Sequence, residues 1–379
     1  MFPDYSNFHS EYIFSPGWIN FIIVWIKIFG SVAAIPYFNI LLNVLILWLL
    51  YKITITTTES RTISYLVLYL FMILPSNSTI SLHLYTEIPF EILSMLSFYL
   101  IFSRKYWHIV IAGICIALAQ WIRPLGVAWI LAALFLLIYQ KRNYKAVITY
   151  AISILITSGS IACMTYQNFP KPIFQAQTGG VNLIMGANDK ATGGYCGEAR
   201  RSPDGLGYLP GLFDSTSYTR VKYYVNDTAF VPKYSDKYTY LEVDSIYKAR
   251  SFNWIAKNPG KWISLIPKKI YLLLNSAPSF AYTQDQNNSH LQTIRGISII
   301  SYLIGKMFVF IVLLSFVGLV MPFWKNYKMI YVLIPIIITS AMTVATSSMV
   351  RYNFIMIPFI LIFACYSLKL LYDKYWRIN

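Results

Sequence analysis

Long apolar runs occupy most of this chain, and one polar segment from about residue 167 to about residue 292 interrupts them. Apolar runs of this kind are typical of helices that cross a membrane, where every backbone hydrogen bond must be satisfied within the protein. A hydrophilic stretch of that length is rarely structureless. The pattern therefore predicts an all-α polytopic membrane protein that carries one folded domain on one face of the membrane.

The composition agrees with a membrane protein and argues against nucleic acid as a partner. Of 379 residues, 57% are hydrophobic and 12% are charged, whereas a soluble domain carries about 25% charged residues. The net charge is +16, but the basic residues are mostly scattered singly in short loops, as topology signals are. Three of the four cysteines lie in apolar runs, so we expect neither a disulfide framework nor a metal framework.

Nine spans are predicted from the apolar runs. They lie at about 33–51, 62–76, 88–103, 107–122, 125–140, 146–166, 297–322, 328–346 and 353–372. Residues 17–30 are apolar but short for a span, so we expect a re-entrant or interfacial helix there. The spans divide the chain into an N-terminal transmembrane module (1–166), an extracytoplasmic domain (167–292) and a C-terminal transmembrane module (293–379).

The loops between these spans alternate in charge. One set is rich in Lys and Arg, and the positive-inside rule makes that set cytoplasmic. The other set holds Glu87, Arg123, Arg351 and the whole polar segment, which are then outside. This arrangement is expected for a multi-pass protein of a bacterial cytoplasmic membrane. It also places the N-terminus outside without a targeting segment, so we expect that a first span and part of the first outer loop are missing.

The polar segment is predicted to be a mixed α/β domain. Residues 170–235 are rich in Gly, Pro, Asp, Ser and Tyr, which favours loops and short strands. The pattern becomes helical at 237–256 and stops at the Asn-Pro-Gly sequence of 258–260. A second helical stretch at 261–274 is amphipathic and is expected to lie on the membrane surface.

Several short motifs, taken in order, resemble those of a known family. They are YTEIPF at 85–90, AGICIALA at 112–119 followed by WIRP at 121–124, the Asn- and Gly-rich run 182–195, IAKNPGK at 255–261 and RYNFIMIP at 351–358. Together they resemble the GT-C glycosyltransferases of the dolichyl-phosphate-mannose–protein mannosyltransferase and aminoarabinose transferase type, over most of the chain.

The resemblance implies a GT-C-like fold and transfer of a sugar from a polyprenyl-phosphate-linked donor. The acceptor is a glycan, lipid or protein at the outer face, and transfer usually inverts the anomeric centre. The family normally carries an acidic residue just after its first span. This chain starts too late to include it clearly. Asp4 and Glu11 are the candidates, and Asp4 is the one that we assign to that role. No resident cofactor is expected, and a divalent metal is left open.

Glu87 is the main catalytic candidate. Ionisable groups at the end of a span are costly and often functional, and a carboxylate there can take the proton of an acceptor hydroxyl. The alternative is an acidic residue that only marks a helix start. Glu91, one turn further, shares its face and is expected to have a structural or supporting role.

Four basic residues are candidates for the donor phosphate: Arg123, Arg351, Lys268 and Lys269. Cations stabilise the charge that a polyprenyl phosphate gains as the glycosidic bond breaks, and the guanidinium fork suits phosphate. The alternatives are interfacial snorkelling for the arginines and a face toward lipid headgroups for the lysines. Asn182, Asn188 and His83 are candidates for a substrate loop, although the asparagines also suit turns and a lone histidine is often structural.

Two other functions remain open from sequence. Polymerases and ligases of surface polysaccharides also combine apolar spans with one large outer loop. A flippase of lipid-linked oligosaccharide is disfavoured, because charges here cluster at span ends and not near the membrane midplane. Nucleotide-binding glycine motifs do not occur in the sequence, which suits a lipid-linked donor.

Overall fold

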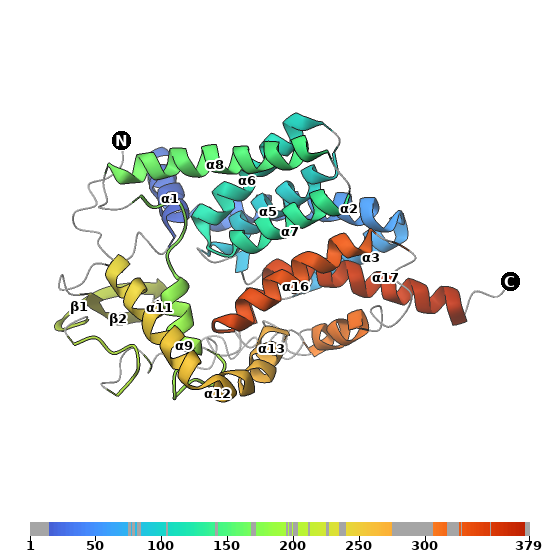
Figure 1. Cartoon of the computed structure of the whole chain (residues 1–379). Helices are drawn as coiled ribbons and strands as arrows, with labels where there is room; N and C mark the ends of the chain where they lie inside the picture. The colour runs from blue at the N-terminus through green and yellow to red at the C-terminus, as the bar shows by residue number, and fades with distance from the viewer. Residues whose placement is uncertain are drawn as a thin grey trace.

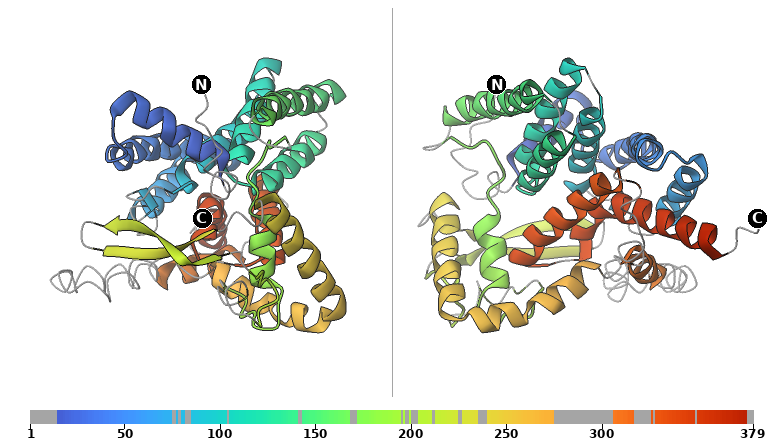
Figure 2. Two further views of the ribbon diagram at one scale, coloured as in Figure 1. Left: turned by 90° about the vertical axis from the view of Figure 1, so that its left-hand side faces the viewer. Right: turned by 45° about the vertical axis from the view of Figure 1, so that its right-hand side comes forward.

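The computed structural model describes residues 15–74, 77, 80–81, 85–103, 105–140, 143–167, 172–194, 196, 199, 204–210, 213–224, 227–234, 240–274, 306–316, 326, 328–348 and 350–375. The fold is mainly helical, and apolar helices from both halves of the chain lie together (Figure 1). The helices of the polar segment gather at one end of this bundle, which the two views of Figure 2 also show.

An apolar helix overlaps each predicted span, although some ends differ by several residues. In the first half the apolar helices are α1 (Pro16–Phe29), α2 (Ile35–Thr58), α3 (Arg61–Ile73), α5 (Glu87–Ile101), α6 (Tyr106–Ile122), α7 (Gly126–Tyr139) and α8 (Tyr144–Tyr166). In the second half they are Lys306–Phe316, α16 (Met329–Ala345), the 3-10 helix η5 (Val350–Met356) and α17 (Ile357–Tyr375). Each predicted span therefore has a helical counterpart among the described residues.

Three helices of the described chain are long and apolar enough to cross a membrane. They are Ile35–Thr58, Tyr144–Tyr166 and Tyr352–Tyr375, the last of which joins part of η5 to α17. A multi-pass membrane protein agrees with these lengths. The other apolar helices have between 10 and 17 residues, so the predicted total of nine spans stays a prediction.

Short connections between the helices are set by local capping. The α2 helix ends at Glu59, whose φ of 55° is left-handed and lets its N–H bond back to Ile55 O at 3.0 Å. Ser60 then caps α3 by accepting from the N–H of Ile63 at 3.4 Å. Asn143 begins α8 in the same manner, accepting from the Lys145 N–H at 3.1 Å. These caps keep the helical hairpins tight.

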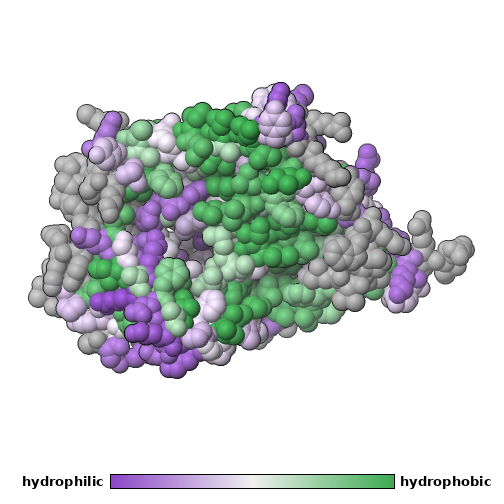
Figure 3. All heavy atoms as spheres, viewed as in Figure 1, coloured by the Kyte–Doolittle hydropathy of each residue, from purple (hydrophilic) through white to green (hydrophobic). Residues whose placement is uncertain are grey.

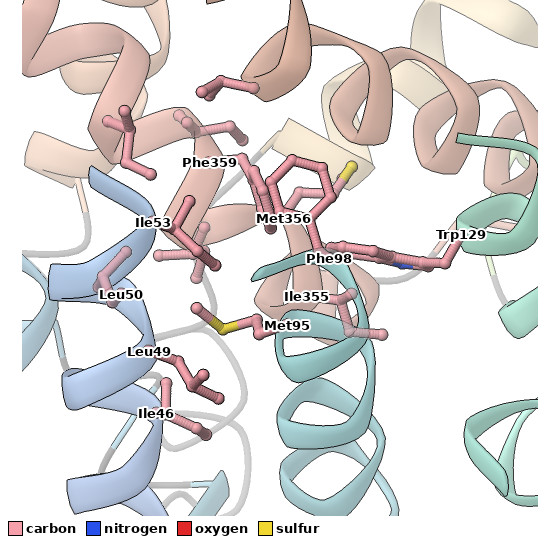
Figure 4. Close-up of a cluster of buried hydrophobic side chains, with 14 of the residues drawn as sticks. Ile46, Leu49, Leu50, Ile53, Met95, Phe98, Trp129, Ile355, Met356 and Phe359 are labelled. Carbon is pink, nitrogen blue, oxygen red and sulfur yellow. The ribbon is translucent and has the colours of Figure 1, made fainter. Parts of the chain in front are cut away.

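The main core lies where α2, α5, α7, η5 and α17 meet (Figure 4). Phe98 of α5 lies edge-on to Phe359 of α17 and to Trp129 of α7, with ring centroids 5.1 and 6.2 Å apart. Leu50 and Ile53 of α2 complete this cluster and are fully buried. Aromatic edge-to-face packing adds about 0.5–1.5 kcal/mol per pair to the burial of apolar area. The core therefore fixes α5, whose first residue is Glu87.

The polar segment is built mainly from helices. Its elements are α9 (Gly179–Gly186), β1 (Phe213–Tyr224), β2 (Asp227–Tyr234), α11 (Tyr240–Lys257), α12 (Pro259–Ser264) and α13 (Ile266–Leu274). The two strands pair only with each other, as one antiparallel ribbon. No mixed α/β sheet domain is seen in the described part of the chain, where the strands form only this ribbon. The small core of this segment packs α9 against α11 instead.

Helix α9 was not expected from the Gly- and Asn-rich sequence around it. Its first turn is stabilised from outside the helix, because the carboxylate of Asp244 on α11 accepts from the Gly180 N–H at 2.6 Å. The other oxygen of Asp244 meets Lys248 at 2.6 Å. Val181 and Ile184 then pack against α11 in a buried cluster. This capping contact from another helix thus compensates for the low helix propensity of glycine.

The helix expected at 261–274 is two helices. Helix α12 ends at Ser264 and α13 begins at Ile266, so the chain turns between them. Pro267 stands in the first turn of α13, where its missing N–H does no harm. The predicted helix at 237–256 is confirmed by α11, which ends just before Asn258 and Pro259.

The two ends of α16 are tied to different parts of the chain. At its start Lys328 pairs with Glu59, and Asn326 donates to Thr57 O at 3.0 Å. Both contacts lie at the end that the charge pattern predicts to be cytoplasmic. Beyond its last turn, Thr346 accepts from Lys269 of α13. The polar segment therefore sits at the end of α16 opposite to Glu59, as the alternation of the loops predicts.

Candidate functional site

An ion pair joins two of the predicted site residues. The Arg123 guanidinium lies 2.6 Å from a carboxylate oxygen of Glu87. Glu87 is the first residue of α5 and Arg123 caps the end of α6, so two helix ends meet here. The side chain of Arg123 is 13% exposed and that of Glu87 is 2% exposed. The arginine therefore stands nearer to solvent, and the carboxylate lies behind it.

Further contacts hold the Arg123 side chain. The same guanidinium nitrogen donates to Thr86 Oγ1 at 3.1 Å. The ring of Tyr352 on η5 lies 5.5 Å from the guanidinium carbon, within the range of a cation–π contact. Arg351 is the preceding residue of η5, and of this residue the structure describes only the backbone. Residues of three elements, α5, α6 and η5, thus surround the Arg123 guanidinium.

Glu91 lies one turn along α5 from Glu87 and is fully buried. Neither of its carboxylate oxygens has a hydrogen-bond partner within the described part of the chain. Burying an unpartnered polar oxygen costs about 1–3 kcal/mol, and more when the group is charged. Sequence reasoning noticed Glu91 only as a neighbour of Glu87. Its position on a predicted span was the available signal.

The two lysines of α13 differ sharply. Lys268 is exposed, whereas Lys269 is buried and its ammonium donates to Thr346 O at 2.6 Å. The Trp262 ring lies 5.4 Å from the same nitrogen. Burial lowers the pKa of Lys269 from 10.5 to about 8. No carboxylate among the described residues forms an ion pair with it.

The Gly-rich run of the polar segment packs directly onto the turn that follows α16. Ser348 N donates to Gly193 O at 3.2 Å. A Cβ on Gly186 would stand 1.9 Å from Thr346 O, so only glycine permits this approach. This turn leads within a few residues into η5. The run from 182 to 194 therefore lies beside the backbone that carries Tyr352 and Arg351.

The two asparagines of this run have different surroundings. Asn188 is buried, and its amide donates to Ile184 O at 2.7 Å while its oxygen accepts from the Lys190 N–H at 2.8 Å. Its side chain therefore stabilises the turn after α9, which is the turn-forming role that the sequence offered as the alternative to a substrate loop. Asn182 lies on α9 and is half-buried. Two other candidates, Asp4 and His83, lie outside the described residues.

Helix η5 connects the two groups of residues. It contacts α5, which carries Glu87, and it contacts α13, which carries Lys269. Figure 3 shows a hollow between the hydrophobic surface over α7 and α16 and the more hydrophilic surface of the polar segment. Within the described ranges, no three His, Cys, Asp or Glu side chains form a cluster that could hold a metal ion. The site is thus an acid and several cations at the ends of apolar helices.

No protein-family model, curated protein or solved structure matches the chain.

Proposed function

We propose that the chain is an integral-membrane glycosyltransferase of GT-C type. It transfers a sugar from a polyprenyl-phosphate-linked donor to an acceptor at the outer face of a bacterial cytoplasmic membrane. The main support is the buried Glu87–Arg123 pair at a helix end, on the side of the bundle where the polar segment lies. A buried acid paired with a cation at the edge of a span is costly and is typical of functional sites.

In the proposed reaction Glu87 acts as the general base. Its carboxylate takes the proton of the acceptor hydroxyl while that oxygen attacks the anomeric carbon of the donor sugar. The bond between the anomeric carbon and the phosphate oxygen breaks, and its electron pair leaves with the polyprenyl phosphate. Attack from the opposite face inverts the anomeric centre. Arg123 lies against this carboxylate and orients it through the ion pair.

Cations around η5 would stabilise the leaving phosphate. Lys269 has a buried ammonium with no carboxylate partner among the described residues, and Arg123 stands at the more exposed side of Glu87. Arg351 on η5 is the third candidate, by its place in the chain. Positioned cations act strongly where water is excluded, because the local dielectric constant is low.

The test is a transfer assay with the purified full chain in lipid nanodiscs. Polyprenyl phosphates that carry a radiolabelled hexose or pentose serve as donors, and an extract of membrane glycolipids and glycans serves as acceptor. We expect Glu87→Gln and Arg351→Ala each to reduce transfer at least about a hundredfold, the range of a general base or an oxyanion-stabilising group. Glu59→Gln, at the other end of the bundle, is the matched control and should keep the wild-type rate.

Wild-type rates in both site variants would rule out this assignment of the site. The donor distinguishes a polysaccharide polymerase or ligase from the proposed enzyme, since these alternatives require an oligosaccharide on the lipid. A flippase would move lipid-linked oligosaccharide across proteoliposomes without cleaving it. Transfer of an oligosaccharide, or movement of the lipid without cleavage, in place of monosaccharide transfer would contradict the proposed function.

A further inference from the structure

A stripe of buried oxygens continues inward from Glu87 along one face of α5. Glu91 and Ser94 follow at the spacings i+4 and i+7, which place side chains on the same side of a helix. Both residues are fully buried. Both carboxylate oxygens of Glu91 and the hydroxyl of Ser94 lack a hydrogen-bond partner within the described part of the chain. The stripe runs about 10 Å along the helix axis, at 1.5 Å per residue.

Aromatic side chains lie next along the same face of α5. Phe98 follows Ser94 by one turn and packs edge-on against Trp129 and Phe359, as Figure 4 shows. The indole N–H of Trp129 is also buried and lacks an acceptor among the described residues. The stripe thus begins at an ion pair and ends at an apolar aromatic cluster.

The chemistry of these groups selects a ligand. Buried polar groups are nearly always hydrogen-bonded, so three unpartnered oxygens indicate a partner that brings hydroxyl donors. An acid repels phosphate, and a lipid tail placed against these oxygens would leave their desolvation uncompensated. A polyhydroxylated ring satisfies acceptors and donors together, whether Glu91 is ionised or neutral.

We propose that Glu91 and Ser94 form an inner subsite that binds hydroxyls of a sugar ring, behind the Glu87–Arg123 pair. The proposal rests on the proposed function and names where the sugar lies. The ring belongs either to the lipid-linked donor or to a carbohydrate acceptor, which share this chemistry. In both cases the phosphate stays near Arg123 and the hydroxyls point toward Glu91.

The experiment measures binding to the full chain in nanodiscs, without turnover. The probes are bare polyprenyl phosphate, polyprenyl phosphates bearing mannose, galactose or arabinose, and the same free sugars at millimolar concentration. The variants are Glu91→Leu, Glu91→Gln and Arg123→Gln, with Glu59→Gln as the control. Melting temperature of each variant is recorded first. We expect Glu91→Leu to melt at or above the wild type, because an apolar side chain replaces an unpartnered buried acid.

For the wild type we expect one sugar-bearing lipid to bind about tenfold more tightly than the bare lipid, as hydrogen bonds to a carboxyl group provide. Glu91→Leu should reduce that advantage to less than about twofold and leave the bare lipid unaffected, whereas Glu91→Gln should keep most of it. Arg123→Gln should weaken all the lipid probes alike. If a free sugar instead shows the Glu91-dependent binding, the ring is that of the acceptor.

Two outcomes overturn the subsite. One is that Glu91→Leu still binds the sugar-bearing lipid more tightly than the bare lipid, by the same factor as the wild type. The other is wild-type protein that binds no sugar-bearing lipid and no free sugar better than it binds bare lipid and buffer. Failure of the proposed function is a different result, in which bare polyprenyl phosphate does not bind the wild type at all. Binding of free sugar that depends on Glu91 would then still support the subsite.

Discussion

The guanidinium of Arg123 and the carboxylate of Glu87 form a nearly dry ion pair, 2.6 Å apart, between the end of one apolar helix and the start of its neighbour. The two residues come from α6 and α5, which pack along their lengths. A buried pair of this kind is expensive to break, since removal of one partner leaves the other charge without compensation. The pair therefore ties the geometry of the site to the stability of the fold.

The first prediction concerns this coupling. Arg123→Gln and Glu87→Gln should each reduce the unfolding free energy by about 3–5 kcal/mol, whereas the double variant should lose clearly less than the sum. Denaturant titration of the purified protein in detergent provides the measurement. Additive losses would mean that the two side chains do not interact in the folded chain.

The second prediction concerns Lys269 and pH. Its pKa is lowered to about 8, so between pH 8 and 10.5 the folded chain binds fewer protons at this residue than the unfolded chain. The stability contribution of Lys269 should therefore rise with pH through that window, by at most about 1.4 kcal/mol per unit, and be flat below pH 8. Lys269→Met should abolish the rise, and the exposed neighbour variant Lys268→Met should retain it.

Lys269 also gives a pH dependence to binding of an anion. Above pH 8 the free protein must take up a proton to bind phosphate through this residue. Affinity for polyprenyl phosphate should then fall by up to about tenfold per pH unit, whereas Lys269→Arg should show no such fall, because arginine stays charged. Equal pH profiles in the two proteins would remove Lys269 from the phosphate site.

The third prediction uses two glycines. A Cβ on Gly186 would meet the Thr346 carbonyl at 1.9 Å, whereas one on Gly159 of α8 meets nothing within 4 Å. Gly186→Ala should therefore separate the polar segment from the turn after α16 and lower the melting temperature by several degrees. Gly159→Ala should keep or slightly raise it, since alanine favours a helix by up to about 1 kcal/mol. Equal effects would show that this close approach is absent.

The fourth prediction concerns sidedness. The side chains of Glu59 and Asp189 are 71% and 67% exposed and belong to opposite ends of the bundle. In a Cys163→Ser background, which removes the exposed native cysteine, Glu59→Cys should react with an impermeant maleimide only after the cells are opened. Asp189→Cys should react in intact cells. Labelling of both from the outside would contradict the topology.

Much of the fold followed from the sequence because apolar runs set helix positions directly. The predicted spans at 107–122 and 146–166 differ from α6 and α8 by two residues or fewer at each end. The pairing of Glu87 with Arg123 was not predicted, although both residues were. Their helices are adjacent, and only packing shows that the two ends meet.

The polar segment was harder to predict, because distant residues decide its local structure. Helix α9 depends on Asp244, which lies 64 positions further along the chain. Lys268 and Lys269 had the same predicted role, and the difference between them was missed for a similar reason. The carbonyl of Thr346 and the ring of Trp262 contact Lys269 alone of the two. Short-range patterns carry no information about such contacts.

The contacts at both ends of α16 have a consequence for the surrounding lipid. This helix has 17 residues, so it spans about 25 Å, whereas the hydrocarbon core of a bilayer is about 30 Å thick. Glu59 holds one end and Lys269 holds the other, so on the prediction that α16 crosses the membrane we expect the bilayer to thin beside it. Nanodiscs of shorter-chain lipids should therefore raise the melting temperature, and an equal melting temperature across chain lengths would exclude such a mismatch.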